Sequence, residues 1–297
     1  MKIRIIIYFL LLLSLPTQLH AQTKRALVIG LGEQEDKAWG KINGDRDVPY
    51  VMEMLKNAKF KMGNVKKLVN QQATKSAIVN AFKALASQSK RGDVVYVHFS
   101  GHGQQMKDMH NDEKDGLDEC WIPYDAYRKP CEKDRGEKHL TDDEVNYYLN
   151  AIRDKIGETG KMLVVIDACH SGGATRGDED EVVRGVEDIF EAIKSFIWGT
   201  SADNGKADVN PNAKENEERW ITISACKSDQ VNIEMKSPAV GKLTYAIYNK
   251  VKENIGNDND DFIRRIRKFV NSNTGSRPQY PVMTGETDRF RITDIIQ

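Results

Sequence analysis

Short apolar segments alternate with amphipathic segments along most of this chain, and this alternation limits the possible folds more than any other feature. The apolar segments have the length of buried strands, whereas the amphipathic segments carry apolar residues at helical spacing. Strands are predicted at 25–30, 65–69, 93–100, 162–166 and 220–224, and helices at 45–55, 74–85, 141–156, 243–251 and 262–270. Strands that are separated by helices pair in parallel, so the sequence predicts an α/β fold with a mostly parallel central sheet and helices on both faces.

Local signals refine this outline at four places. Thr141 and Glu144 form a capping box, which marks the start of a helix. Two prolines between 278 and 285 place a last strand at the edge of the sheet, because proline cannot donate a hydrogen bond to a central ladder. Residues 104–138 are polar and are expected to form a loop. Residues 174–218 are expected to form a polar insertion in which only 186–198 has helical periodicity.

The first 21 residues have the parts of a secretory signal peptide. Lys2 and Arg4 precede an eleven-residue apolar run at 5–15, and cleavage is expected after Ala21. The run is shorter than the roughly 20 residues that span a hydrocarbon core. We therefore expect residues 22–297 to form one exported domain, secreted or periplasmic, without a stable membrane anchor. An uncleaved membrane tether is the alternative.

The charge balance excludes one class of partner. The chain carries 44 Lys and Arg residues against 44 Asp and Glu residues, so its formal net charge is zero. A protein that binds nucleic acid through phosphates needs a basic surface that releases counterions. No nucleic-acid partner is therefore expected, and the oligomeric state stays unknown.

The four cysteines have no metal-binding spacing. The chain contains no C-x-x-C pair and no histidine cluster, which argues against a structural zinc site. In an oxidising compartment Cys120 and Cys131 would be able to form a disulfide across a loop. Four cysteines in a chain of this length do not amount to a disulfide scaffold.

Two predicted strands end in unusual motifs, His98-Phe-Ser-Gly-His-Gly103 and Asp167-Ala-Cys-His-Ser-Gly172. Parallel strands present their carboxyl ends at one edge of a sheet, where ligands bind. If the two strands are neighbours, Cys169 and His102 face each other across a cleft. Cys169 is then a candidate nucleophile, His102 its acid–base partner, and the Gly103 amide a donor to an oxyanion. An inert buried thiol is the competing interpretation, and His170 is a weaker candidate base.

These two motifs, in this order, resemble those of caspase-like cysteine peptidases, closest to the metacaspase and orthocaspase branch. The similarity extends from Arg25 to about Ala225. It implies a caspase-like sandwich at 22–297 and a cysteine endopeptidase with a dyad of His102 and Cys169. It implies no cofactor that the chemistry requires.

The resemblance also implies a substrate pocket. In metacaspase-like enzymes, acidic residues at the positions of Asp167 and Asp47 bind the side chain before the cleaved bond, and Ser100 lines the same pocket. The loop around Asp47 is one residue shorter than the usual family spacing, so Asp45 is an alternative. Carboxylates in this pocket would receive Arg or Lys, whereas cleavage after Asp would need basic residues there.

Calcium is a further expectation, because it activates some metacaspases. The positions that match the calcium ligands of such enzymes are Asp118, Asp142 and Asp143, whereas a fourth position falls near Arg176 and departs from the pattern. Asp142 and Asp143 also have a simpler explanation, because acidic residues in a first helical turn complement the helix dipole. The metal site is therefore unknown at this stage.

The polar insertion at 174–218 matches the segment that carries the activating cut in caspase-like enzymes. It offers five basic residues to an acidic pocket: Arg176, Arg184, Lys194, Lys206 and Lys214. We therefore expect an exported cysteine endopeptidase that cuts protein or peptide substrates after Arg or Lys and processes itself. A catalytically inactive peptide-binding or scaffold protein, and an acyl-transfer enzyme with the same nucleophile, are the alternatives.

Overall fold

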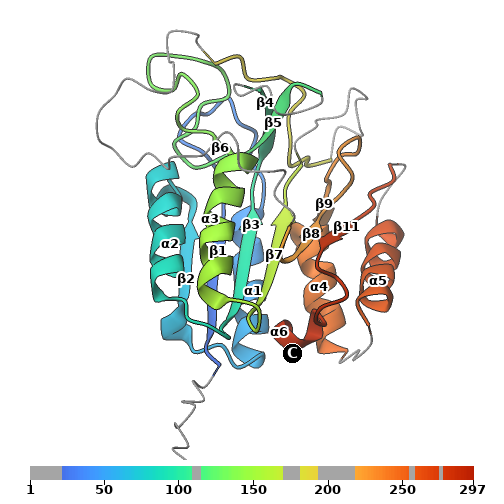
Figure 1. The fold of residues 1–297 in the computed structure, drawn as a ribbon. Helices are drawn as coiled ribbons and strands as arrows, with labels where there is room; N and C mark the ends of the chain where they lie inside the picture. Colours follow the sequence, from blue (N-terminus) through green and yellow to red (C-terminus); the bar gives the residue numbers. More distant parts are fainter. Residues whose placement is uncertain (1–21, 109–114, 170–180, 193–217, 254–257, 274–276) are drawn as a thin grey trace, which may run out of the picture.

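A six-stranded sheet forms the centre of the protein, with the strand order β11-β8-β7-β3-β1-β2 (Figure 1). The computed structural model describes residues 22–108, 115–169, 181–192, 218–253, 258–273 and 277–297, so the expected signal peptide lies outside the described residues. The strands are β1 (Lys24–Gly30), β2 (Val65–Val69), β3 (Val94–Ser100), β7 (Lys161–Asp167), β8 (Ile221–Ser224) and β11 (Val282–Gly285). All neighbours pair in parallel except β11, which runs antiparallel to β8 at the edge. The parallel sheet and its last edge strand confirm the sequence prediction.

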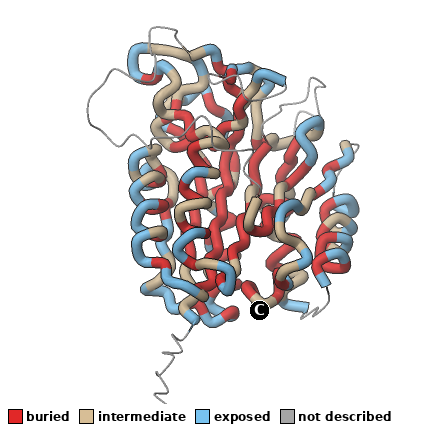
Figure 2. Tube along the Cα trace, in the orientation of Figure 1, coloured by how far each residue is buried: buried red, intermediate tan, exposed pale blue. Residues whose placement is uncertain are grey.

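Helices cover both faces of this sheet, as the sequence predicts (Figure 1). One face carries α1 (Gly44–Asn57), α4 (Lys242–Lys252), α5 (Asn259–Ser272) and α6 (Thr293–Ile296), and the other carries α2 (Lys75–Gln88) and α3 (Asp142–Ile156). The short helices η1 (Met62–Asn64) and η2 (Asn70–Gln72) flank β2. Successive strand residues point to opposite faces, so Tyr96 of β3 packs in one core and Val97 in the other. Figure 2 shows that the strands of the central sheet are mostly buried, whereas the helices around it have an exposed side. Among the helices of the described ranges, none is long and apolar enough to cross a bilayer.

The central strand β3 determines how residues are arranged at the edge of the sheet where the parallel strands have their carboxyl ends. All seven residues of β3 are buried, as expected for a strand with helices on both faces. It pairs with β1 on one side and with β7 on the other, in a register that sets Ser100 opposite Asp167. The two motifs that follow β3 and β7 therefore start from adjacent strand ends.

The loop predicted at 104–138 is wrong in part, because the region contains two strands. β4 (Gly103–Lys107) and β5 (Leu117–Trp121) pair antiparallel, and β6 (Leu140–Thr141) adds a third strand. Charged residues interrupt the apolar pattern of β5, but tertiary packing decides its conformation, since Trp121 is buried and stacks on Phe99. Cys120 and Cys131 are both thiols, so the disulfide considered between them does not form.

The helix predicted at 186–198 is also wrong over its described part, 186–192, where no helix forms. Phe190 makes a parallel bridge with Met106 of β4, and its ring is buried in a small apolar cluster with that residue. Backbone pairing and burial of one aromatic side chain outweigh the helical periodicity of the segment. Earlier in the same segment, Val183 makes an antiparallel bridge with Ile233, which directly precedes a hairpin formed by β9 (Glu234–Lys236) and β10 (Ala239–Gly241).

A close backbone contact at Gly44 positions α1 against the edge of the sheet. A Cβ atom at Gly44 would lie 2.5 Å from the carbonyl oxygen of Leu31 and 2.6 Å from that of Ser100, which is closer than real contacts allow. Only glycine lets the first turn of α1 approach the end of β3 so closely. Asp47, on the same helix, is thereby brought to the carboxyl edge of the sheet.

Replacing Gly44 by alanine is expected to destabilise the protein. Overpacking of this kind lowers the free energy of unfolding by about 1 to 3 kcal/mol, which denaturant titration measures. Gly63→Ala is the matched control, because no atom lies within 4 Å of a Cβ atom built there. Equal stability of the two variants would contradict this account of the contact.

Candidate active site

His102 and Cys169 follow the two central strands and lie at the same edge of the sheet. β3 ends at Ser100, two residues before His102, and β7 ends at Asp167, two residues before Cys169. Both His102 and Cys169 are only 2% exposed. The structure therefore places at one edge the two residues that the sequence selects, whereas His170 lies outside the described residues.

The His102 ring is held in one orientation. Its Nε2 atom lies 2.7 Å from the carbonyl oxygen of Gly40, and since a carbonyl only accepts, Nε2 carries the proton. Nδ1 is buried, has no hydrogen-bond partner in the described part of the chain, and so keeps a lone pair. Burial lowers the pKa of His102 to about 4, so the ring is neutral at neutral pH. Nδ1 is therefore the atom that can accept a proton from a nucleophile.

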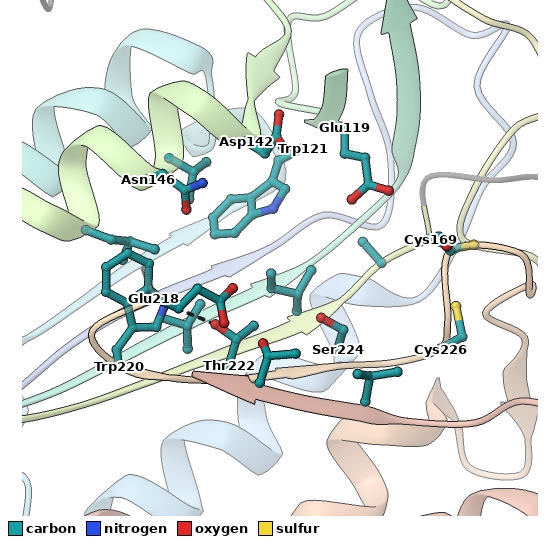
Figure 3. A pocket seen from close by; sticks show the side chains of 18 of the residues that line it. Glu119, Trp121, Asp142, Asn146, Cys169, Glu218, Trp220, Thr222, Ser224 and Cys226 are labelled. Carbon is teal, nitrogen blue, oxygen red and sulfur yellow. Dashed lines mark hydrogen bonds between the residues drawn. The ribbon is translucent and has the colours of Figure 1, made fainter. Parts of the chain in front are cut away.

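The thiol of Cys169 donates a hydrogen bond to the carbonyl oxygen of Gln230, 2.9 Å away. The thiol of Cys226 donates to the same oxygen over 3.4 Å, so the two sulfur atoms share one acceptor. Both cysteines line a cavity of about 280 Å³ between α3 and the strands β7 and β8. Figure 3 shows their side chains at one end of the group that lines it. The carboxylates of Glu119, Asp142 and Glu218 line this cavity. Cys169 thus borders a cavity that is lined by both carboxylates and apolar side chains.

The protein's own chain occupies the cleft between the two motifs. The carbonyl oxygen of Arg184 accepts a hydrogen bond from the amide of Cys169 over 2.9 Å and a second from the amide of Gly103 over 3.3 Å. Two amides that converge on one carbonyl oxygen are the arrangement of an oxyanion hole. The role predicted for the Gly103 amide therefore has its geometric counterpart, with the Cys169 amide as the second donor.

The side chain of Arg184 is fully buried among three carboxylates. Nη1 lies 2.6 Å from Oδ2 of Asp47 and 3.3 Å from Oδ1 of Asp167, and Nε lies 2.9 Å from Oε1 of Glu234. The sequence points to Asp47 and Asp167 through the family resemblance, but it gives no sign of Glu234. Glu234 comes from the hairpin β9-β10, where no local motif marks it as a pocket residue.

Burial and the guanidinium act in opposite directions on these carboxylates. Burial raises the pKa of Asp47 to about 6, although the charge of Arg184 opposes the shift. Burial also acts to raise the pKa of Asp167, but the charge of Arg184 and hydrogen bonds from Thr244 and Asn232 outweigh it, so this pKa lies below its ordinary value. The pKa of Arg184 is raised, because the attraction of the carboxylates exceeds the penalty of burial. The pocket is therefore built for a cation.

The remaining predicted pocket residues lie near this cluster without all touching it. Ser100 Oγ lies 2.8 Å from Nε2 of His98, and Thr244 Oγ1 lies 3.3 Å from the same nitrogen while donating to Asp167 over 2.6 Å. Ser100 thus belongs to a buried polar network that ends at the pocket. Asp45 accepts a hydrogen bond from Asn70 instead, so of the two aspartates on α1 it is Asp47 that faces Arg184.

The three aspartates considered for calcium do not form a metal cluster. Within the described ranges, no group of three or more His, Cys, Asp or Glu side chains has the arrangement to hold a metal ion. Asp142 and Asp143 begin α3, where their charge complements the helix dipole. The fourth position, near Arg176, lies outside the described residues. Calcium activation therefore stays a prediction, and no step of the chemistry is assigned to it.

The parallel sheet, the helices on both faces, and a histidine and a cysteine that follow adjacent strands define a caspase-like α/β protein. The family described as "Caspase domain" matches residues 23–291, which is most of the chain. The chain therefore belongs to the caspase family of cysteine endopeptidases.

Curated relatives are metacaspases from several eukaryotic lineages. Metacaspase-1 of Pyricularia oryzae is 25% identical over 290 residues, which cover 86% of this chain and 70% of that protein. Metacaspase-1 of Schizosaccharomyces pombe is 28% identical over 246 residues, covering 71% of this chain and 54% of that protein. Metacaspase-2 of Arabidopsis thaliana is 31% identical over 165 residues, covering 53% and 36%. The chain thus spans about half or less of the last two relatives, and the resemblance to metacaspases is confirmed.

Two crystal structures share the fold. A protein from Geobacter sulfurreducens superposes with a TM-score of 0.62 at 21% identity, covering 93% of this chain and 100% of that one. Caspase-1 from Spodoptera frugiperda superposes with a TM-score of 0.55 at 12% identity, covering 89% and 86%. At these identities the likeness concerns the fold alone, and it confirms the caspase-like sandwich.

Substitution of Cys169 or His102 is expected to remove peptidase activity. Cys169→Ala should abolish hydrolysis of peptides, because the nucleophile is lost, and His102→Ala should lower kcat by roughly 10² to 10⁴. Cys131→Ala is the control, since it removes a partly exposed thiol of the 104–138 region. Hydrolysis that persists in Cys169→Ala would contradict the assignment.

Proposed function

We propose that this chain cleaves peptide bonds after Arg or Lys through Cys169 and His102, and that its first substrate is its own bond between Arg184 and Gly185. The seating of Arg184 carries the proposal: the guanidinium lies among three carboxylates while the carbonyl oxygen accepts from two amides. A carboxylate pocket attracts a cationic side chain and repels an acidic one. Of the five basic residues in the insertion, only Arg184 belongs to the described part of the chain.

The geometry supports an acyl-enzyme mechanism. Cys169 Sγ attacks the carbonyl carbon of Arg184 and transfers its proton to Nδ1 of His102. The carbonyl oxygen becomes an oxyanion, which the amides of Gly103 and Cys169 stabilise. His102 returns the proton to the nitrogen of Gly185 as the C–N bond breaks, and a thioester remains on Cys169. Water then hydrolyses the thioester with His102 as base and restores the thiol.

Backbone hydrogen bonds hold the segment before this bond in the manner of a substrate strand. The amide of Arg184 donates to the carbonyl oxygen of Asn232 over 2.9 Å, and the amide of Glu234 donates to that of Val182 over 2.9 Å. A peptide that adds to a strand in this way gains affinity from its main chain, while pockets read its side chains. Other substrates would use the same strand once residues 181–184 have left it.

The residues after the bond are held as well. A Cβ atom at Gly185 would lie 2.5 Å from the carbonyl oxygen of Cys169, so the chain passes the nucleophile at a distance that only glycine permits. The amide of Phe190 donates to the carbonyl oxygen of Gln105 over 2.8 Å, and the Phe190 ring is buried. The bond between Arg184 and Gly185 is thus anchored on both sides of Cys169.

The uncut chain blocks its own pocket in this arrangement. Self-cleavage would therefore precede activity on other substrates, because Arg184 has to leave before another basic side chain can enter. A catalytically inactive binding protein with the same fold would keep the segment in place, so the integrity of the chain separates the two functions.

Export is the other part of the proposal. The charged start, the apolar run at 5–15 and the small residue at position 21 support it. Protein recovered after expression with its own first 21 residues should begin at Gln22, as mass spectrometry of the amino-terminal peptide would determine. A mature protein that retains Met1 or Lys2 would refute a cleaved signal.

The purified protein is expected to cut itself after Arg184. Intact-mass analysis should find two fragments that end and begin at Arg184 and Gly185, while Cys169→Ala stays one chain. Arg184→Gln should abolish this cut because the pocket loses its cation, and Arg176→Gln, which removes another basic residue of the insertion, should leave it unchanged. The experiment is done with and without calcium. An intact wild-type chain with full peptidase activity would refute self-processing.

Acidification is expected to weaken the binding of basic substrates. Burial raises the pKa of Asp47 to about 6 even with the guanidinium of Arg184 beside it. In the pocket that Arg184 has left, Asp47 is therefore neutral at and below this pH, and the pocket has lost a negative charge. KM for peptides with Arg before the cut should then rise, while kcat holds until His102 is protonated near pH 4. Asp47→Asn should show a raised KM already at neutral pH and little further pH dependence of KM. Steady-state kinetics on both enzymes decides, and identical KM profiles would count against Asp47.

A further inference from the structure

Glu181 lines a cavity beside the candidate active site. It is the fourth residue before the bond proposed to be cut, the P4 position, and its side chain is only 8% exposed. Its Oε2 atom lies 3.7 Å from Nε of Arg277, whose side chain is 14% exposed. Lys242, the first residue of α4, is 2% exposed and lies on the same side of the cleft, since it lines a cavity together with Glu181. An acidic side chain is therefore held close to two largely buried cations.

The cavity that Glu181 and Lys242 share has a volume of about 520 Å³. Burial lowers the pKa of Lys242, while the charges of Glu181 and Asp167 act to raise it, so Glu181 is close enough to stabilise the lysine cation. Glu234 also lines the cavity, but its Oε1 atom accepts a hydrogen bond from Arg184. The charges left to interact with a side chain at the position of Glu181 are therefore positive.

Residues at the start of α4 contribute to this cavity and to the Arg184 pocket. The amide of Gly241 donates to Asp47 over 2.8 Å, and the amide of Thr244 donates to Asp167 over 2.8 Å. Lys242 lies between these two residues in the chain. The first turn of α4 therefore fixes the distance between Lys242 and the carboxylates that surround Arg184.

We propose that Lys242 and Arg277 form a subsite for an acidic side chain at P4. The inference rests on the proposed function of the same site, and it narrows the substrate class to peptides with Asp or Glu at P4 and Arg or Lys immediately before the cut. Residues 181–184 carry an acidic and a basic residue at this spacing. The segment therefore has the sequence that the two pockets select in other substrates.

The test compares fluorogenic tetrapeptides that differ only at P4: Glu-Val-Val-Arg, Gln-Val-Val-Arg and Lys-Val-Val-Arg. The enzyme is the full-length protein after self-cleavage, as wild type, Lys242→Gln, Arg277→Gln and Lys242→Arg. Wild type should prefer the Glu peptide over the Gln peptide by about tenfold in kcat/KM, because a partly buried ion pair is lost. Each Gln variant should reduce this ratio, and Lys242→Arg should retain it.

The ratio between two peptides is measured on one enzyme preparation, so a merely structural loss would lower both rates and leave the ratio unchanged. Lys252→Gln is the matched control, because it neutralises a lysine at the exposed far end of the same helix. Equal kcat/KM for the Glu and Gln peptides in wild type, with cleavage after Arg preserved, would overturn the subsite and leave the proposed function standing. Absence of any cleavage after Arg would overturn both.

Discussion

A guanidinium buried among three carboxylates stabilises the carboxyl-terminal edge of the sheet, where His102 and Cys169 lie. Arg184 is fully buried, and its contacts with Asp47, Asp167 and Glu234 are all 3.3 Å or shorter. An isolated charge in such surroundings costs several kcal/mol, and so does each carboxylate without a cation. The cation and the pocket therefore stabilise each other, and the carbonyl group of Arg184 is held against the amides of Gly103 and Cys169 as a consequence.

The pocket does not depend on Arg184 for its shape, because each carboxylate has supports of its own. Asp47 is carried to the edge by the close approach of α1 at Gly44 and accepts the Gly241 amide. Asp167 accepts hydrogen bonds from Asn232 and Thr244, and Glu234 accepts a hydrogen bond from the backbone amide of Asn43. Such supports preorganise a site for a cation that arrives later. In the proposed self-cleavage the pocket releases one arginine and then binds another basic side chain, which requires this independence.

Features that depend on neighbouring residues in the sequence could be predicted, whereas features that depend on contacts between distant segments could not. The sheet follows from local periodicity, and the placement of His102 and Cys169 follows from the rule that parallel strands end at one edge. Asp47 and Asp167 come from the family resemblance. Glu234 could not be found, because its role arises only when the hairpin β9-β10 packs beside α1. The strands β4 and β5 were not predicted for a similar reason, since their conformation depends on the tertiary burial of residues such as Trp121.

In the proposed self-cleavage, the selection of one basic residue among several is likewise a question of geometry rather than of composition. A carboxylate pocket recognises charge, so by chemistry alone each basic residue at 174–218 satisfies it equally. Arg184 is the one of them that the described ranges include, and there the chain before it pairs with Asn232 and the chain after it pairs with β4 through Phe190. A peptide fixed on both sides presents a single carbonyl group to the amides of Gly103 and Cys169. Fixing the reacting groups in this way converts a preference for charge into the choice of one bond.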